Sequence, residues 1–114
     1  MDRYLSFASM IIPSNDAFVG NSDPKAYPIF DGEGNLLRDQ IIISNLRVYD
    51  AGTEINDEIP ENTAFLAQSA PNTGTTEDGV VTLHGGFNAA GSGGIVDQAS
   101  FSNAGVNLPN QQSL

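Results

Sequence analysis

The stretch Tyr4-Leu-Ser-Phe-Ala-Ser-Met-Ile-Ile12, followed by Pro13-Ser-Asn15, decides the fold class. Larger apolar side chains alternate with small or polar ones along it, and a period of two is typical of a strand with one buried face. The Pro-Ser-Asn sequence ends the strand, because proline and asparagine favour turns. A short apolar piece at 17–19 follows, so the sequence predicts two short strands separated by a turn.

Further strands are expected where short apolar runs lie between turn residues. The run at 40–49 is the richest in β-branched residues. No stretch has the apolar spacing of an amphipathic helix, although 64–69 and 97–101 could each form one helical turn. The sequence therefore predicts an all-β fold, a C2-like antiparallel β-sandwich with long loops and at most one or two short helical turns. Its remaining strands are expected at 27–30, 36–37, 80–83 and 94–96.

The chain has 114 residues, a length that suits one domain with a single core. Residues 1–103 are expected to form this domain, and residues 104–114 a polar C-terminal tail. No stretch approaches the roughly 20 apolar residues that span a bilayer. The sequence after Met1 also lacks the basic and apolar regions of a signal peptide.

The charge balance is strongly acidic, with 14 Asp and Glu against 4 Lys and Arg and a formal net charge of −10. The basic residues are scattered, so no Lys or Arg cluster is available to bind a nucleic-acid backbone or an anionic membrane surface. The absence of cysteine excludes disulfides, thiolate metal sites and cysteine nucleophiles. A hard cation such as Ca²⁺ is therefore the partner that this composition suits best.

Three carboxylates stand where strands are expected to end. Asp16 follows the first strand, and Asp50 and Glu54 flank Gly52 after the 40–49 stretch. Ca²⁺ takes about six to eight oxygen ligands, and a glycine allows such a loop to fold back so that both carboxylates reach one ion. We therefore expect Asp16, Asp50 and Glu54 to be metal ligands. The alternative is that the acids of this loop are solvated and that Asp50 and Thr53 cap turns.

Two other motifs carry little chemistry. Asp31-Gly-Glu-Gly-Asn35 has the oxygen spacing of an EF-hand loop, but Leu36 and Ile42 stand where that loop needs glycine and glutamate, so a hairpin turn is expected. His84, the only histidine, precedes two glycines and is expected to be exposed or bonded within a turn. Since no Gly-x-Ser-x-Gly motif is present either, we predict that the protein is not an enzyme.

The same segments resemble a known family. Leu5-Ser-Phe-Ala-Ser-Met-Ile-Ile-Pro-Ser-Asn-Asp-Ala-Phe-Val-Gly20 is similar to the opening signature of the spondin N-terminal (F-spondin) domain. Tyr49-Asp-Ala-Gly-Thr-Glu-Ile-Asn-Asp-Glu58 is similar to its second signature. Two further stretches, Ala70-Pro-Asn-Thr-Gly74 and Glu77-Asp-Gly-Val-Val81, resemble bacterial members. The likeness keeps the same order from about residue 4 to residue 101.

The resemblance implies an antiparallel β-sandwich related to C2 domains, with a Ca²⁺ ion held by loops at one end. Its ligand positions correspond to Asp16, Asp50 and Glu54; animal members have aspartate in place of Glu54, whose extra methylene shifts the reach of its oxygens. Family members usually have strands before the first signature and after residue 101. The domain is therefore expected to lack terminal strands, or to share a strand with a partner or a flanking segment.

Animal members of the family are extracellular matrix proteins of cell adhesion and recognition of microbial surfaces. On this resemblance we expect a non-enzymatic, extracellular or cell-surface module that binds Ca²⁺ and an unidentified protein or glycan ligand. A metal-free structural or assembly module is the alternative, and a carbohydrate-active hydrolase is a remote one.

Overall fold

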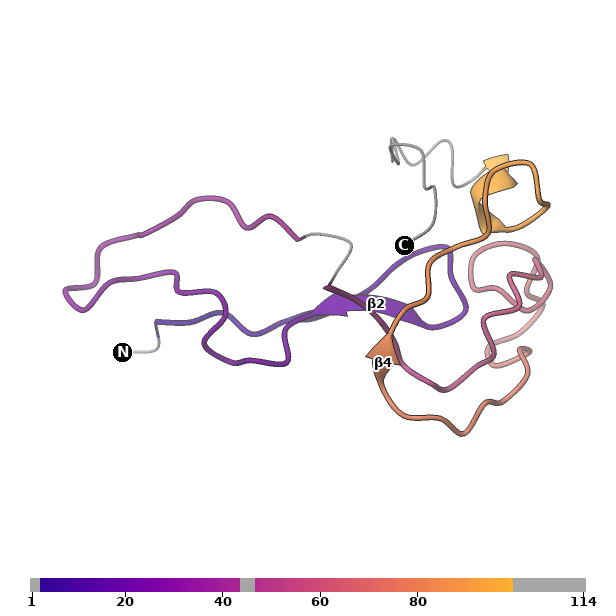
Figure 1. The fold of residues 1–114 in the computed structure, drawn as a ribbon, viewed down its shortest axis with the longest axis horizontal. Coiled ribbons are helices and arrows are strands. Elements are labelled where there is room, and N and C mark those ends of the chain that lie inside the picture. The colour runs from indigo at the N-terminus through magenta and orange to yellow at the C-terminus, as the bar shows by residue number, and fades with distance from the viewer. Residues whose placement is uncertain (1–2, 44–46, 100–114) are drawn as a thin grey trace.

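The computed structural model describes residues 3–43 and 47–99. Within these ranges it contains one open antiparallel sheet with the strand order β1-β2-β3-β4 (Figure 1). Its elements are β1 (Ala8–Met10), β2 (Ala17–Gly20), β3 (Val48–Asp50), β4 (Thr82–Leu83) and one 3-10 helix, η2 (Ile95–Asp97). The prediction of a β-rich chain with almost no helix is confirmed, whereas the described residues contain no second sheet that would complete a sandwich.

The turn between β1 and β2 is present where the sequence predicts it. Ile11 N donates to the carbonyl of Ala17 over 2.8 Å. The Ser14 hydroxyl donates to the carbonyl of Ile11 and accepts the N–H of Ala17. Ala17 also pairs with Asp50 of β3, so this turn lies beside the end of the neighbouring strand. The expected Ca²⁺ ligands thus lie at one end of the sheet, in the β1–β2 turn (Asp16), at the last residue of β3 (Asp50) and in the loop that follows it (Glu54).

Several predicted strands are shorter than expected. The stretch 4–12 is a regular strand only over β1, and 80–83 only over β4. Of the stretch 40–49, only the last two residues belong to β3, while residues 44–46 lie outside the described ranges. Ile42 is 81% exposed. A β-branched residue favours a strand because its side chain packs on neighbouring strands or on a core. The exposed Ile42 side chain has no such packing, so its β propensity does not lead to a strand here.

The hairpin expected around residues 31–35 is present, because Phe30 bridges Leu36. Asp31 holds the turn by accepting hydrogen bonds from the Asn35 side chain and from the backbone N–H groups of Glu33 and Asn35. The Asn35 side-chain bond is the largest cause that lowers the pKa of Asp31. The carboxylate of Asp31 is therefore used to cap its own turn.

The prediction of a strand at 94–96 is wrong, because η2 occupies this place. Asp97 accepts hydrogen bonds from Gly91 N and Gly93 N, which close a loop onto the helix and lower the pKa of Asp97. The helical turn expected at 97–101 overlaps η2 only at Asp97, and residues 100–101 lie outside the described ranges. The stretch 64–69 contains hydrogen-bonded turns in place of a helical turn.

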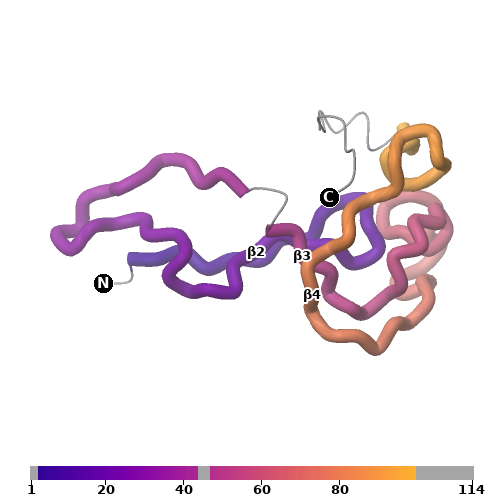
Figure 2. Tube along the Cα trace, in the orientation of Figure 1, coloured from indigo at the N-terminus to yellow at the C-terminus, as the bar shows by residue number. Residues whose placement is uncertain are grey.

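The molecule is elongated, with a radius of gyration of 16.4 Å where a compact chain of this length has about 13 Å. Figure 2 shows an arm on one side of the sheet, formed by residues 3–7 and 21–43, and a loop head on the other, formed by the loops before and after β4, residues 51–81 and 84–99. Hydrogen bonds from Leu5 N to Tyr27 O and from Ile29 N to Arg3 O hold the arm together.

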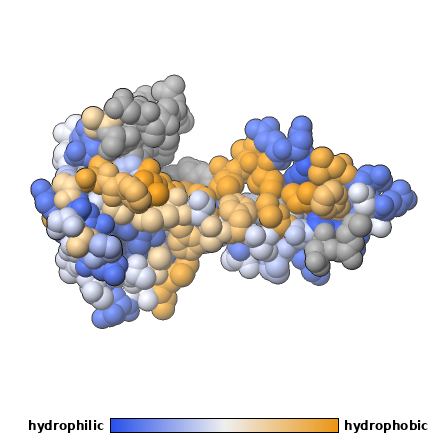
Figure 3. All heavy atoms as spheres, turned by 180° about the vertical axis from the view of Figure 1, so that it is seen from behind, coloured by the Kyte–Doolittle hydropathy of each residue, from blue (hydrophilic) through white to orange (hydrophobic). Residues whose placement is uncertain are grey.

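Apolar burial is slight in the described part of the chain. The buried hydrophobic residues are Ala17, Tyr27 and Ile95, and they are outnumbered by buried polar ones, namely Ser14, Asn15, Asp16, Glu58, Thr63 and His84. Larger apolar side chains lie on the surface instead (Figure 3), among them Val80, Val81 and Leu83 near β4. Hydrogen bonds to buried polar side chains therefore organise much of the loop head.

The described residues include no helix that is long and apolar enough to cross a membrane.

Candidate functional site

Asp16 joins the β1–β2 turn to the loop that follows β3. Its Oδ2 accepts three hydrogen bonds, from Thr53 N at 2.7 Å, Thr53 Oγ1 at 2.8 Å and Glu54 N at 3.0 Å. Asp16 stands directly before β2, and Ala51 N donates to its backbone carbonyl. The carboxylate thus satisfies donors of a loop 37 residues further along the chain, and it is only 9% exposed.

The other oxygen of this carboxylate, Oδ1, is buried and has no hydrogen-bond partner in the described part of the chain. A buried acceptor without a donor costs roughly 1–3 kcal/mol, and more when it is charged. Native proteins therefore rarely leave such an atom without a partner, a bound water or an ion. Asp16 Oδ1 is the atom of this site that most needs an external ligand.

Glu54 brings a second negative charge to the same place. Its pKa is raised, first by burial and then by the neighbouring carboxylates of Asp16 and Asp57. The Glu54 side chain packs closely against Gly74, where a Cβ atom would lie 2.6 Å from Glu54 Oε2. Within residues 3–43 and 47–99 we find no donor to its carboxylate. The ionised form of Glu54 is therefore disfavoured in the folded protein, and a bound cation would favour it.

Asp50 uses its carboxylate within its own loop. Oδ1 accepts the N–H of Gly52 at 2.6 Å, and Oδ2 accepts the side-chain amide of Asn56. The structure thus brings Asp16 and Glu54 together, while Asp50 shapes the loop that carries Glu54. Among the described residues, no three His, Asp or Glu side chains are grouped so that they could hold a metal by themselves.

Sequence reasoning missed the hydrogen-bonded residues next to Asp16 and Glu54. Asn15 donates to Asp57 Oδ1 over 3.3 Å and accepts the N–H of Glu58 over 3.3 Å. Asp57 also accepts the side-chain amide of Asn62 at 2.6 Å. The only signal in the sequence is that Asn15 adjoins Asp16 and that Asp57 and Glu58 follow Glu54 closely. These contacts keep the β1–β2 turn against the start of the 58–72 loop.

His84 is buried, with 8% exposure, so the expectation of an exposed histidine is wrong while that of a turn bond is confirmed. Its Nδ1 accepts the N–H of Gly86 at 3.0 Å, and its ring centroid lies 4.8 Å from that of Phe87. His84 N also donates to Val48 O over 3.0 Å, so the pairing with β3 continues one residue beyond β4.

No family model, curated protein or solved structure matches this chain. The fold and the site define it as a β-rich chain with an acidic pair, the buried Asp16 and the partly buried Glu54, at one end of its sheet. The spondin-type assignment stays a prediction that rests on the quoted signatures.

Glu54→Gln is expected to stabilise the cation-free protein at neutral pH. Because the pKa of Glu54 is raised in the folded state, the folded chain binds this proton more tightly than the unfolded chain. The contribution of Glu54 to stability therefore falls as the pH rises from its ordinary value of 4.5 through the raised value. Glutamine carries no charge, so the variant does not lose this stability. Above this pH interval its free energy of unfolding is expected to exceed that of the unaltered protein by up to about 1 kcal/mol.

Urea unfolding of both proteins in EDTA, between about pH 4 and about pH 7.5, measures this gain. The difference in free energy of unfolding between Glu54→Gln and the unaltered protein should increase as the pH rises. Glu33→Gln, which removes an exposed charge from the arm, is the control and should show no such trend. A Glu54→Gln effect that does not vary with pH would contradict the electrostatic explanation.

Proposed function

We propose that this protein is a non-enzymatic β-domain that binds Ca²⁺ at the loop end of its sheet, with Asp16 and Glu54 as the carboxylate ligands. The observation that carries the proposal is the buried, unpartnered Asp16 Oδ1. Glu54 supports it, because its carboxylate lies close enough to Asp16 and Asp57 for their charges, after burial, to raise its pKa. The residues present fit a hard cation, which prefers carboxylate and other oxygen ligands.

The protein groups have distinct parts in this proposal. Asp16 Oδ1 and the Glu54 carboxylate hold the ion, while Asp16 Oδ2 keeps its hydrogen bonds to Thr53 and Glu54. Asp50 positions the loop through Gly52 and Asn56. With two carboxylates the remaining ligands are neutral oxygens, such as backbone carbonyls or water. Bound Ca²⁺ then pins the β1–β2 turn to the loop after β3.

We further propose a spondin-like β-sandwich that serves extracellular adhesion or surface recognition. Its support is the ordered likeness of two signatures, which contain Asp16 and Asp50 to Glu54 respectively. In this proposal an added strand covers an edge of the open sheet, contributed by a partner or a flanking segment. A metal-free structural module is the competing explanation, and Ca²⁺ binding separates the two.

Thermal unfolding in Ca²⁺ and in EDTA tests the site. A ligand specific for the folded state at about one hundred times its Kd adds roughly 2.7 kcal/mol, which is a rise in Tm on the order of 10 °C for a domain of this size. Asp16→Asn should lose most of this rise. The variant keeps an oxygen that can accept the Thr53 and Glu54 hydrogen bonds, so it should still fold.

Asp39→Asn is the matched control, because it removes one exposed carboxylate from the arm. It should keep the full rise in Tm. Equal melting temperatures of the unaltered protein in Ca²⁺ and in EDTA would contradict the Ca²⁺ site and favour the metal-free module.

A further inference from the structure

An open groove of about 550 Å³ runs beside the acidic pair. One wall comes from the β1–β2 region and Glu54, and the other from residues 64–72 of the loop head. Its volume falls within the range of about 300–1,000 Å³ that is common for ligand sites. The groove is therefore large enough to receive a side chain of a partner together with part of its backbone.

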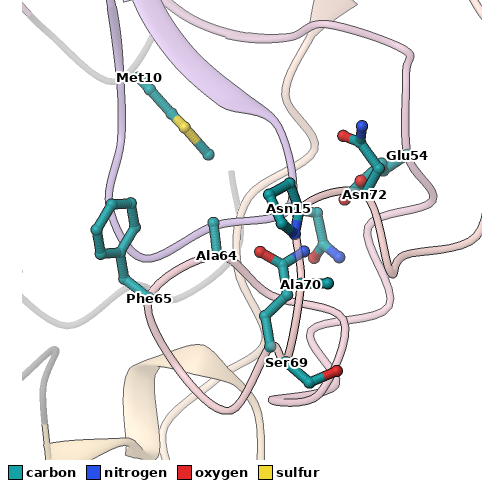
Figure 4. A pocket seen from close by; sticks show the side chains of 10 residues that line it. Met10, Asn15, Glu54, Ala64, Phe65, Ser69, Ala70 and Asn72 are labelled. Carbon is teal, nitrogen blue, oxygen red and sulfur yellow. The ribbon is translucent and has the colours of Figure 1, made fainter.

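The two ends of the groove differ in chemistry (Figure 4). Met10 and Phe65 lie at one end, and Glu54 and Asn72 at the other. Among the described residues that line the groove, Glu54 is the only charged one, and none is Lys, Arg or His. The groove thus offers an apolar surface at one end and a negative charge without a described donor at the other.

Phe65 combines an exposed side chain with a left-handed backbone conformation. Its side chain is 74% exposed, and its backbone has a φ of 66°. A bulky residue in the left-handed region costs roughly 1–2 kcal/mol, and exposure forgoes the gain of burying an aromatic ring. Both costs are expected where a ring serves a ligand, since strained conformations gather at functional sites.

We propose that this groove binds a lysine or arginine side chain of an extended segment of a partner protein. The alkyl stem of that side chain lies on Met10 and Phe65, and its cationic group pairs with the Glu54 carboxylate. A carboxylate attracts such a cation, and the alkyl stem of a Lys or Arg side chain packs favourably on apolar surface. The net charge of −10 favours a basic partner as well, and it disfavours a second copy of this chain. The inference concerns the Ca²⁺-free protein, because Ca²⁺ and this cationic group would compete for the Glu54 carboxylate.

Titration by two-dimensional NMR in EDTA provides the test. The probe is the acetylated and amidated peptide Gly-Ser-Arg-Ser-Gly, and its match is the same peptide with neutral citrulline in place of arginine. The arginine peptide should shift the amide signals of residues 54, 65 and 72, and the citrulline peptide should bind at least about tenfold more weakly. Equal affinity of the two peptides would overturn the proposal.

Two variants of the protein test whether Glu54 and Phe65 contact the peptide. Glu54→Gln should weaken binding of the arginine peptide about tenfold. Phe65→Ala removes apolar surface under the alkyl stem and should weaken binding about threefold. Glu33→Gln makes the same change in net charge on the arm and should have no effect. The spectra also show whether each variant is folded. If neither variant weakens binding, the groove is not the site.

The Ca²⁺ proposal fails separately, through equal melting temperatures in Ca²⁺ and EDTA. Because the peptide titration contains no Ca²⁺, its outcome stands whether or not the cation binds.

Discussion

Glu58→Ala is expected to destabilise the protein by about 3 kcal/mol or more. Glu58 is only 6% exposed, and its two carboxylate oxygens accept the N–H groups of Asn88 at 2.6 Å and Ile95 at 2.9 Å. Alanine leaves both donors without this acceptor, and Ile95 is fully buried. Hydrogen bonds to a charged group contribute roughly 1.5–3 kcal/mol each, so their joint loss is large for a domain with little apolar burial.

Urea unfolding measures the loss, and amide hydrogen exchange locates it. Asn88 and Ile95 should lose protection in the variant, because Glu58 is what ties their segment to the 58–72 loop. Glu61→Ala is the control, since Glu61 is an exposed glutamate three positions further along the same loop. Equal stability of the two variants would show that the Glu58 bonds contribute nothing.

Local signals explain the parts of the fold that the sequence predicted well. The turn before β2 depends on Ser14, which bonds to residues within three positions. The hairpin at 31–35 depends on Asp31, which bonds to residues within four positions. A side chain that caps its own turn leaves its mark in a short window of sequence, so both turns could be located without the structure.

Contacts between distant segments explain what sequence reasoning missed. Glu58 meets partners 30 and 37 residues away, and Asn15 meets Glu58 across 43 residues. No periodicity reports such a pairing. The predicted closeness of Asp16 and Glu54 came from their placement at the ends of strands, and a hydrogen bond now joins them. The alternative that Asp50 caps its own turn is confirmed by the hydrogen bond from Gly52 N to its Oδ1, whereas the bond from Asn56 to its Oδ2 could not be foreseen from spacing alone.

Gly52→Ala is the second change with a large expected effect, a loss of about 3 kcal/mol or more. Gly52 has a φ of 70°, where an alanine is strained. A Cβ atom there would also lie 2.8 Å from both the N and the O of Val80. These are backbone atoms, and Gly79 N donates to Gly52 O over 2.7 Å, so neither of the two segments can move aside without breaking this hydrogen bond.

The control for Gly52→Ala is Gly85→Ala, because a Cβ at Gly85 meets nothing within 4 Å. Its stability should stay within about 0.5 kcal/mol of the unaltered protein. The comparison also bears on the acidic pair, since Gly52 directly precedes Thr53 and Glu54, whose N–H groups bond to Asp16. Displacing this loop separates those donors from Asp16, so Gly52→Ala should lose the Tm rise in Ca²⁺ that Gly85→Ala keeps. Equal urea unfolding of the two variants would mean that the loop after β3 does not pack on residues 79–80 in solution.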